Sequence, residues 1–338
     1  MSAADPSLFT YHKDKIRLYM VIYVDDILLT GNSKAEIARL LENLHHRFEL
    51  RDLGSLNHFL RIQATNTKHG ILLHLKQYAQ QILLRAGMQE TKPVTTPVST
   101  KVTLNTHSQE PYTNTQLYRQ LIGALQYLTL TRLDIQFARN QLSQFMHNPL
   151  NVHFETLKRL LRYIKGTIDK GISLYRDSLI LSGYVDSDWA TNSHDRKSIT
   201  GYCYFMGKSI ISWQVKKQTS VARSSTEAEY RALATAATKM IWLRRLLEDF
   251  HIPQKEPTLV YCDNTSTIAL ANNPVFHART KHIDVDSHFF RDCIQNNKLT
   301  VHHMCTNDQI ADIFTKPLSI LRFRTLASKL IIDIPSSV

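Results

Sequence analysis

The sequence predicts a multidomain protein that combines α/β and α+β architecture. Its 338 residues allow two or three domains, at about 100 to 200 residues each. Strand-like patterns at both ends of the chain are separated by helix-like spacing in the middle. A stretch rich in Pro and Thr, residues 91–115, interrupts both patterns. The hydrophobic content of 43% and charged content of 21% are typical of a folded globular protein.

Residues 1–90 form a small α+β unit in this prediction. The stretch VIYVDDILLTG predicts two buried strands that meet at a tight turn at Asp25 and Asp26, with Gly31 ending the second strand. An amphipathic helix, KAEIARLLENLHHRFEL, and a second strand pair that turns near Gly70 follow. The adjacent acids fit a solvated β-turn. They equally fit half of a metal site, because neighbouring carboxylates repel and a divalent cation offsets the repulsion.

Residues 91–170 begin as an extended connector with Pro93, Pro97 and Pro111 and continue as three helices. The helices are QLYRQLIGALQYLTL, LDIQFARNQLSQFMH and HFETLKRLLRYIKGT, each with an apolar stripe and basic residues on the opposite face. Each stripe can be buried against its neighbours, so we expect a packed basic arm rather than a membrane-binding surface.

Residues 171–338 return to strands and then alternate with helices. The predicted strands are GISLYR, LILSGYVDSDWA and SITGYCYFMGKSIISWQV, the last with a hairpin turn at Gly207 and Lys208. A long helix, SSTEAEYRALATAATKMIWLRRLLEDF, leads to the strand TLVYCDN, two helices, the strand KLTVHHM and a final helix, NDQIADIFTK. Three strand segments, the last of them a hairpin, therefore precede the long helix of a mixed sheet flanked by helices.

Charge and cysteine content narrow the classes of partner. The net charge of +12 and the isoelectric point near 9.5 favour a polyanion, nucleic acid before an anionic membrane. The four cysteines show no C-x-x-C spacing, so neither a zinc knuckle nor a disulfide framework is indicated. The longest apolar run, LYMVIYV, is too short to span a bilayer, and the N-terminus lacks a signal-like apolar region. We expect a soluble, unsecreted protein, either nuclear or cytoplasmic.

Four acids of the last segment occupy strand ends and helix starts, which converge at one edge of an α/β sheet. They are Asp186, Glu229, Asp263 and Asp312. Such a cluster needs cations, which predicts bound Mg²⁺ or Mn²⁺. Two ions about 3.5 to 4 Å apart can activate a water and stabilise the leaving oxygen of a phosphodiester.

Each acid also has a simpler explanation. Asp188 lies on the same strand face as Asp186 and competes with it for the role. Glu229 competes with a capping role, because Ser224 to Glu227 fits a capping box and Thr226 to Glu229 has the same spacing. Asp263 can cap the next helix, and Asp312 can be a solvated helix acid.

Eleven segments, in order and spacing, closely resemble the C-terminal part of copia-type LTR-retrotransposon Pol polyproteins. They are YVDDILLTG, DLGSLNHFL, YRQLIGALQYLTLTR, LKRLLRYIKGT, YVDSDWA, DRKSITGYC, SWQVKKQT, SSTEAEYRAL, CDNTSTIAL, RTKHID and ADIFTKPL. The resemblance covers nearly the whole chain. It implies a C-terminal remnant of a reverse-transcriptase palm in 1–90, a thumb or connection in 91–170 and an RNase H-like domain in 171–338.

Carried over by residue, the resemblance gives Asp186, Glu229, Asp263 and Asp312 the role of the RNase H tetrad, with two Mg²⁺ or Mn²⁺ ions. Asp25 and Asp26 match the metal-binding aspartates of the polymerase. The third polymerase carboxylate has no counterpart, since Asp5 and Asp14 lie in no matching motif. We therefore expect a remnant polymerase site that does not synthesise DNA alone.

The chain departs from the family pattern at three positions. Arg61 stands at a usual Gly, Leu133 at a usual Pro and Thr191 at a usual Gly. A long or branched side chain at a glycine position carries strain wherever the backbone needs a positive φ. The departures suggest a decaying copy, although none touches the tetrad.

An RNA/DNA hybrid is the expected partner, and other nucleic-acid duplexes share its phosphate contacts. The candidate contacts are Arg196, Lys197, Lys216, Lys217, Gln218, Arg279 and Lys281, each of which also fits a solvated basic loop. A catalytic role for His282, His302 or His303 is not favoured. The leading hypothesis is a hybrid-cleaving RNase H, and the alternative is an inactive nucleic-acid-binding remnant.

Overall fold

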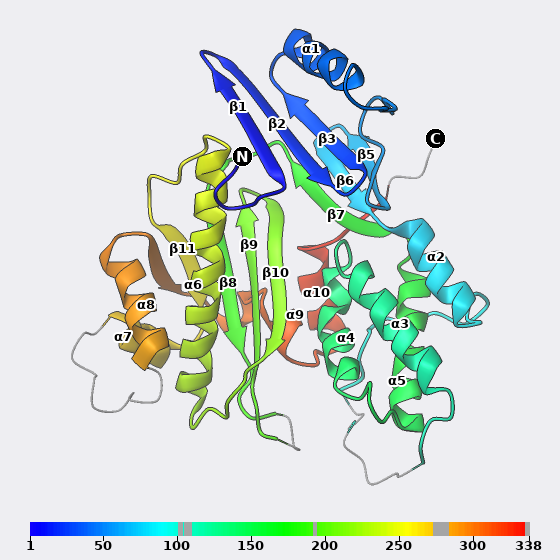
Figure 1. The fold of residues 1–338 in the computed structure, drawn as a ribbon. Coiled ribbons are helices and arrows are strands. Elements are labelled where there is room, and N and C mark those ends of the chain that lie inside the picture. The colour runs from blue at the N-terminus through cyan, green and yellow to red at the C-terminus, as the bar shows by residue number, and fades with distance from the viewer. Residues whose placement is uncertain (101–103, 105–109, 192–194, 273–283, 335–338) are drawn as a thin grey trace.

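A computed structural model describes residues 1–100, 104, 110–191, 195–272 and 284–334 of the protein (Figure 1). It contains three sheets and several helices, which confirms the mixed α/β and α+β class. No helix in these described residues is long and apolar enough to cross a bilayer.

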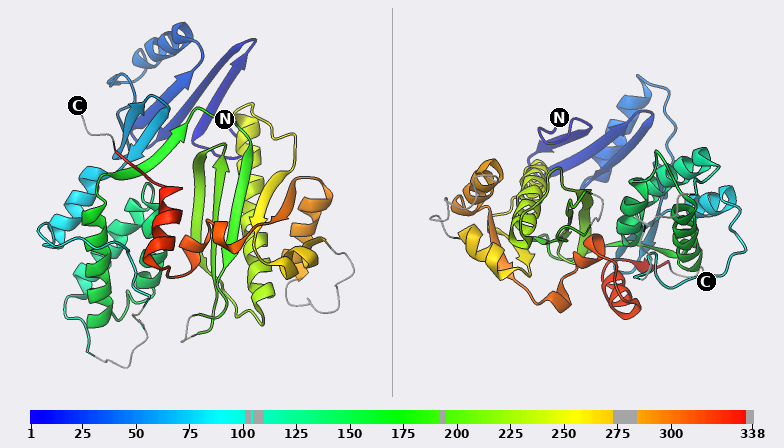
Figure 2. Two further views of the ribbon diagram at one scale, coloured as in Figure 1. Left: turned by 180° about the vertical axis from the view of Figure 1, so that it is seen from behind. Right: turned by 90° about the horizontal axis from the view of Figure 1, so that it is seen from below.

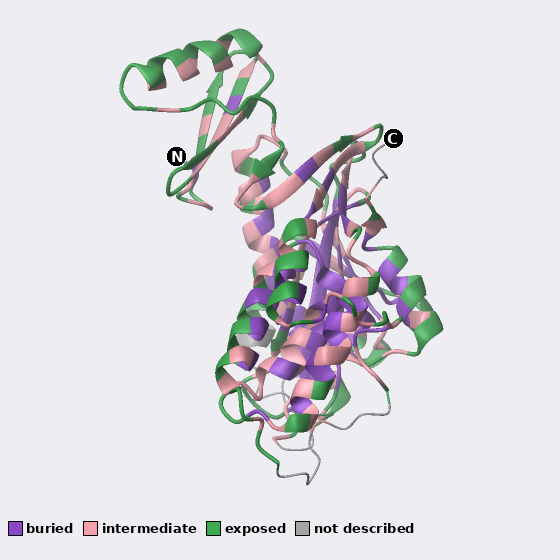
Figure 3. Ribbon diagram, turned by 90° about the vertical axis from the view of Figure 1, so that its right-hand side faces the viewer, coloured by how far each residue is buried: buried purple, intermediate pink, exposed green. Residues whose placement is uncertain are grey.

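The first sheet consists of β1 (Leu8–Lys13), β2 (Ile16–Tyr23) and β3 (Asp26–Gly31), all antiparallel, with α1 (Lys34–His45) beside β3. The predicted hairpin is confirmed, with Tyr23 paired to Asp26. The expectation that its strands are buried is wrong, because Leu8 and Leu18 are the buried residues of these three strands. Helix α1 has no buried residue and therefore covers the sheet poorly. Figure 3 shows this unit standing away from the rest of the chain.

The N-terminal segment reaches the last turns of α6 (Ser225–Asp249) despite this exposure. The Tyr19 hydroxyl donates to the backbone carbonyl of Phe250 at 2.8 Å, and the Trp242 indole N–H donates to the carbonyl of Ala4 at 2.9 Å. These bonds fix the first sheet to the C-terminal half of the protein.

The second sheet has the order β13-β7-β6-β5-β4 and is antiparallel throughout. Its strands are β4 (His58–Phe59), β5 (Ile62–Thr67), β6 (Gly70–His74), β7 (Lys170–Tyr175) and β13 (Ile332–Asp333). The predicted β5–β6 hairpin is confirmed. The sheet joins strands from the first and the last of the three predicted segments, and the division of the chain at residues 90 and 170 stays a prediction.

The backbone of Arg61 has the strained, positive-φ conformation that the sequence predicts. It lies between β4 and β5 with φ +64°, next to Leu60 with φ +50°. This left-handed conformation costs a residue with a Cβ about 1 to 2 kcal/mol. The other two departures differ: Leu133 is fully buried, and it is Ala190, before Thr191, that has a positive φ, +52°.

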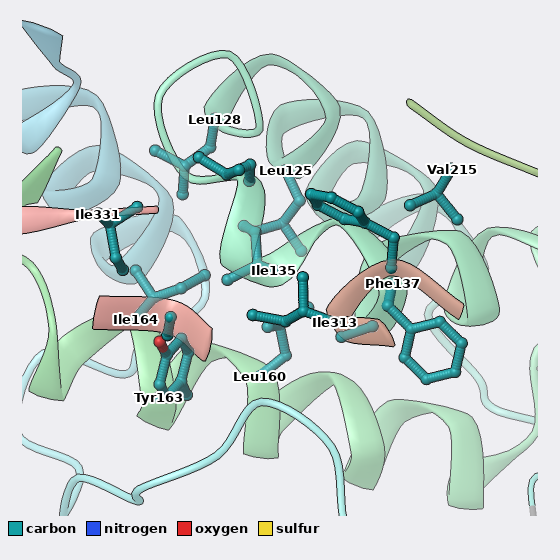
Figure 4. Packing of buried hydrophobic residues seen from close by; sticks show 14 of the residues in the cluster. Leu125, Leu128, Ile135, Phe137, Leu160, Tyr163, Ile164, Val215, Ile313 and Ile331 are labelled. Carbon is teal, nitrogen blue, oxygen red and sulfur yellow. The ribbon is translucent and has the colours of Figure 1, made fainter. Parts of the chain in front are cut away.

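The three predicted central helices are present and form a packed unit with one further helix. They are α3 (Thr115–Leu128), α4 (Gln136–Ser143), which follows a short turn η1 (Leu133–Ile135), and α5 (Asn151–Gly166); the further helix is α2 (Lys76–Arg85). Figure 4 shows the core where Leu125, Ile135 and Leu160 meet Val215 and Ile313 from the last segment. The apolar stripes therefore form core, as predicted.

A buried polar network lies within this helical unit. The Arg132 guanidinium pairs with the Asp134 carboxylate at 2.7 Å and donates to the carbonyl of Thr167 at 2.7 Å. The Tyr163 hydroxyl donates to the same carboxylate at 2.6 Å. Each charge is thereby paired, which a buried ion pair requires to be tolerated.

The third sheet has the order β10-β9-β8-β11-β12. Its strands are β8 (Leu181–Ser187), β9 (Ile199–Met206), β10 (Ser209–Lys217), β11 (Thr258–Cys262) and β12 (Leu299–His303). β8, β9 and β10 are antiparallel and precede α6, as predicted, and β11 is parallel to both β8 and β12. The predicted strand GISLYR instead belongs to the second sheet as β7, where it pairs with β6. Helices α6 and α8 (Asp284–Gln295) cover one face, and α9 (Asp312–Thr315) lies on the other (Figure 1).

The final predicted helix, residues 307–316, is wrong as a single element. The chain forms a short turn, η3 (Thr306–Asp308), and then α9. Gln309 interrupts them, because its buried side chain donates to the carbonyl of Val185 at 3.0 Å and accepts from the amide of Ala311 at 3.1 Å. Helix α10 (Ile320–Ser328), which the sequence reasoning missed, packs beside α5 (Figure 2), with the rings of Phe323 and Tyr163 5.6 Å apart.

Candidate acidic site

The pairing of β8 with β11 begins the site. Because these strands are parallel, with Tyr184 opposite Tyr261, their carboxyl ends lie at one edge of the sheet. Asp186 lies near the end of β8, and Asp263 directly follows β11. Asp312 is the first residue of α9, which packs on β8 and β9. Three elements that are far apart in the sequence therefore deliver carboxylates to one place.

These three carboxylates each offer an oxygen within 4.8 Å of the other two. Asp186 and Asp312 are 1% and 2% exposed, and Asp263 is half-buried. In the described residues, no other group of three or more acidic, histidine or cysteine side chains approaches this closely. The predicted convergence of three of the four acids is thus present in the structure.

Glu229 is the fourth predicted acid and lies early in α6, buried at 5% exposure. Its carboxylate accepts a hydrogen bond from the backbone of Ser187, next to Asp186. Burial, and then the charges of Asp186 and Asp263, hold the pKa of the Glu229 carboxyl well above its ordinary value. Glu229 therefore belongs to the same electrostatic cluster, although it is outside the group of three.

Glu227, rather than Glu229, makes the capping contacts at the start of α6. The Ser224 hydroxyl accepts from the amide of Glu227 at 3.1 Å, and the Glu227 carboxylate accepts from the amide of Arg223 at 2.8 Å. Ser224 therefore caps α6, and the Glu227 carboxylate reaches back to the residue before the cap, in a variant of the capping box. Glu227 also pairs with Arg231 at 2.7 Å, which leaves Glu229 directed into the cluster.

The simpler roles considered for Asp186, Asp263 and Asp312 also do not apply to these acids in the structure. Asp188 accepts from the amide of Ile199 and the hydroxyl of Thr191, so it connects the end of β8 to the start of β9. The start of α7 (Thr265–Asn272) is capped by Asn264, whose side chain accepts from the amide of Thr267 at 3.0 Å. Asp312 is buried rather than solvated.

Two cations from the C-terminal segment compensate the buried acids. The Lys316 ammonium lies 2.7 Å from Oδ1 of Asp312 and 3.3 Å from Oδ2 of Asp186. The Arg322 guanidinium lies 2.6 Å from Oδ2 of Asp312. Burial raises the pKa of the Asp186 carboxyl to about 6 against the opposing charge of Lys316. The same carboxylates raise the pKa of the Lys316 ammonium above its ordinary value against the effect of its burial.

The site offers the ligands that a hard divalent cation prefers. All of its convergent groups are carboxylate oxygens, as Mg²⁺ and Mn²⁺ require. Oε2 of Glu229 is buried and has no hydrogen-bond donor among the described residues, which leaves it available as an acceptor. Asp186, Glu229, Asp263 and Asp312 therefore fit a magnesium or manganese centre.

Sequence reasoning missed the groups that support these acids. The Thr306 hydroxyl donates to Oδ2 of Asp263 at 2.9 Å, and the Thr315 hydroxyl donates to Oδ2 of Asp186. Thr315 and Lys316 belong to the quoted segment ADIFTKPL, and the i, i+4 spacing of Asp312 and Lys316 is typical of a helical ion pair. Arg322 lies in α10, which carried no such signal.

The predicted nucleic-acid contacts fall into three groups. Lys216 and Arg196 are exposed, and Lys197 is half-buried. Lys217 is engaged within the protein, 2.7 Å from Asp195, as is Gln218 through bonds described below. Arg279, Lys281 and His282 lie outside the described residues.

Gln218 ties the sheet to α6. Its amide nitrogen donates to the hydroxyls of Ser187 and Thr200 at 3.3 and 3.1 Å and to the carbonyl of Ala228 at 2.9 Å. Ser187 directly follows Asp186, and Ala228 directly precedes Glu229. Gln218 is therefore in a position to fix the distance between these two acids.

Asp25 and Asp26 lie apart from this arrangement, exposed at the tip of the β2–β3 turn. Val24 in the same turn is 82% exposed and has φ +51°, a strained value for a β-branched residue. Within the described part of the chain, no third acid completes a metal-binding group with this pair.

Comparison with known proteins gives the following similarities. A family model described as reverse transcriptase (RNA-dependent DNA polymerase) matches residues 2–100. The retrovirus-related Pol polyprotein from transposon RE1 of Arabidopsis thaliana is 44% identical over 97% of this chain and 22% of its own length. The chain thus spans about a fifth of that relative.

An uncharacterized mitochondrial protein of Arabidopsis thaliana is 46% identical over 67% of this chain and 94% of its own length. Among solved structures, a foamy viral protease-reverse transcriptase in complex with double-stranded DNA is similar over 85% of this chain and 46% of its own. The TM-score is 0.47 and the identity 13%.

Proposed function

The chain belongs to the family of copia-type retrotransposon Pol polyproteins, and on this premise we propose that its acidic cluster is the active site of an RNase H. The proposed reaction is endonucleolytic cleavage of RNA in RNA/DNA hybrids by two-metal catalysis. One observation carries the proposal: three carboxylates from separate elements approach within 4.8 Å, with buried Glu229 beside them.

The proposed roles follow from where each side chain lies. Asp186, Glu229, Asp263 and Asp312 would hold two Mg²⁺ or Mn²⁺ ions. When bound, such ions supply an activated water and stabilise the departing oxygen of a phosphodiester. Thr306 orients Asp263 through its hydroxyl, and Thr315 does the same for Asp186. Arg322 holds Oδ2 of Asp312, whereas Lys316 contacts Oδ1 of the same carboxylate.

The proposed substrate is an RNA/DNA hybrid, held through its phosphates and its groove shape, with the 2′-hydroxyls marking the RNA strand. The net charge of +12 supports a polyanionic partner. Lys216 and Arg196 are exposed, as contact with phosphates would require, and Lys197, next to Arg196 in sequence, is half-buried. Lys217 and Gln218 would act through the internal bonds described above.

We propose the remaining segments as accessory parts. Residues 1–90 are proposed as the remnant of a polymerase palm, and residues 91–170 as its thumb or connection. The Asp25–Asp26 pair is exposed, and no third acid joins it in the described residues, which supports a chain that does not polymerise DNA alone.

Cleavage of an end-labelled RNA strand annealed to DNA, in Mg²⁺, tests the proposal. The wild type is compared with Asp263→Asn and with Asp308→Asn, a control that changes an exposed acid of the neighbouring turn. We expect cleavage by the wild type and by the control and none by Asp263→Asn. Absence of cleavage by folded wild type that still binds the hybrid would leave the alternative, an inactive nucleic-acid-binding remnant.

A further inference from the structure

We infer that Lys316 is a tethered counterion that competes with a divalent cation for the carboxylates of Asp186 and Asp312. The inference rests on the proposed function, because it concerns the same cluster. It adds that cation binding at these two acids requires the Lys316 side chain to leave.

Lys316 is positioned so that its ammonium group reaches the buried carboxylates from the end of α9. The residue directly follows α9, where the backbone becomes extended with φ −143° and ψ 153°. From there its side chain, 35% exposed, reaches two carboxylates that are only 1% and 3% exposed. The ammonium therefore enters a buried acidic site from its open side.

The distances show why the two cations exclude each other. The ammonium contacts Oδ2 of Asp186 and Oδ1 of Asp312 at 3.3 and 2.7 Å. Mg²⁺ binds carboxylate oxygens at about 2.0 to 2.1 Å in a near-octahedral shell. An ion that bridges these acids would meet the ammonium inside its own coordination shell. Both positive groups cannot hold the same pair of carboxylates.

Arg322 is a fixed cation of the site, in contrast to the exchangeable Lys316. Its guanidinium pairs with Oδ2 of Asp312 and also donates to the backbone carbonyls of Thr306 and Asn307. In the described residues, the recorded partners of the Lys316 ammonium are the two carboxylates alone. A lysine has a flexible stem and a compact charge, whereas an arginine holds a planar, directional fork. Lys316 is therefore the cation that can move away.

The counterion role has a consequence for the metal-free protein. Carboxylates that cluster without a cation repel each other, which destabilises the fold around them. Lys316 lowers this repulsion at the junction of β8 and α9. Removing its charge should therefore weaken the metal-free protein and at the same time strengthen its binding of a divalent ion.

Binding of Mn²⁺ alone, measured by calorimetry and by the electron paramagnetic resonance signal of the free ion, tests this inference. The variants are Lys316→Met, which keeps the length but not the charge, and the control Lys329→Met, whose ammonium lies 3.9 Å from Asp308. We expect Lys316→Met to bind Mn²⁺ at least about tenfold more tightly, on the scale by which groups around a metal alter its affinity. In EDTA its Tm should fall below those of the wild type and the control.

A second variant keeps the test open should Lys316→Met fail to fold. Lys316→Arg retains the charge and adds a bidentate fork, so it should bind Mn²⁺ more weakly than the wild type. Equal or weaker Mn²⁺ binding by Lys316→Met overturns the inference, as does equal or tighter binding by Lys316→Arg. Absence of Mn²⁺ binding by the wild type and Lys316→Met alike also overturns it.

Failure of this inference is distinguishable from failure of the proposed function. Hybrid cleavage by the wild type, with Mn²⁺ affinity unchanged in Lys316→Met, refutes only the counterion role. Tighter Mn²⁺ binding by Lys316→Met, with no hybrid cleavage by any form, refutes only the nuclease.

Discussion

The hydroxyl of Thr306 donates a 2.9 Å hydrogen bond to Oδ2 of Asp263 and thereby connects the end of β11 to the turn before α9. Thr306→Val removes this donor with little change of volume. We expect metal affinity or hybrid cleavage to fall by about 10- to 100-fold, as is usual when a partner that orients a metal ligand is lost. The Mg²⁺ dependence of the cleavage rate measures the effect. Thr325→Val, at an exposed position of α10, is the matched control, and an equal loss there would contradict the assignment.

Asp186→Asn should change how stability depends on pH. The pKa of the Asp186 carboxyl is about 6 in the folded protein, against the ordinary value of 3.8 that applies to the unfolded chain. The folded state therefore binds the proton more tightly than the unfolded state does. The stabilisation of the folded state by the protonated Asp186 carboxyl is fully present below pH 3.8. It is lost as the pH rises through 6. The difference corresponds to about 3 kcal/mol at neutral pH. In EDTA, the variant should gain stability relative to the wild type between pH 4 and 7.

Urea unfolding at a series of pH values measures this difference between variant and wild type. Asp188→Asn does not serve as a control, because the pKa of that carboxyl is also raised to about 6. Asp333→Asn, which changes an exposed acid, does. A constant difference between Asp186→Asn and wild type across this range would refute the linkage.

Arg61→Gly should stabilise the protein. The wild-type residue holds φ +64°, which glycine adopts without the clash of a Cβ. We expect a gain of about 1 kcal/mol in the free energy of unfolding. Arg51→Gly, at an exposed position whose φ is not positive, should give no gain. Stabilisation of both variants, or of neither, would show that strain at Arg61 is not the cause.

Asp134→Ala should destabilise the helical unit strongly. It leaves the Arg132 guanidinium buried without its carboxylate and removes the acceptor of the Tyr163 hydroxyl. Loss of one partner from a buried pair typically costs about 3 to 5 kcal/mol. By contrast, Asp333→Ala breaks the exposed pair with Lys170 and should cost about 1 kcal/mol or less. Denaturant unfolding compares the two, and similar losses would contradict the prediction.

Much of the site could be predicted because its acids sit on elements with strong patterns. Asp186 lies on a buried strand, Asp263 directly follows another and Glu229 lies on one long helix. Parallel pairing then brings the two strand ends together. The choice between Glu227 and Glu229 was different: both fit a capping spacing, and the family resemblance indicated Glu229. The structure separates them, since the Glu227 carboxylate is used by the amide of Arg223.

Other features depend on tertiary contacts that no local pattern contains. The apolar pattern of the strands around Asp25 and Asp26 predicts core, yet α1 and the contact of Tyr19 with the end of α6 leave most residues of these strands unburied. The helix predicted over 307–316 is broken by Gln309, whose side chain finds a partner on β8, far away in the sequence. Lys316 was visible as a basic residue, but its contact with Asp186 depends on where α9 packs.

The sheet formed by β4, β5, β6, β7 and β13 has a consequence for how the chain folds. The β5–β6 hairpin closes over a few residues, but β7 joins it from residue 170 onward and β13 only at residue 332. Contacts between residues so distant in sequence slow folding, since a long loop must close before they form. During synthesis the edge of β7 stays open until residue 332 has left the ribosome. Premature termination before residue 332 would therefore release a protein with an exposed strand edge, a template for aggregation.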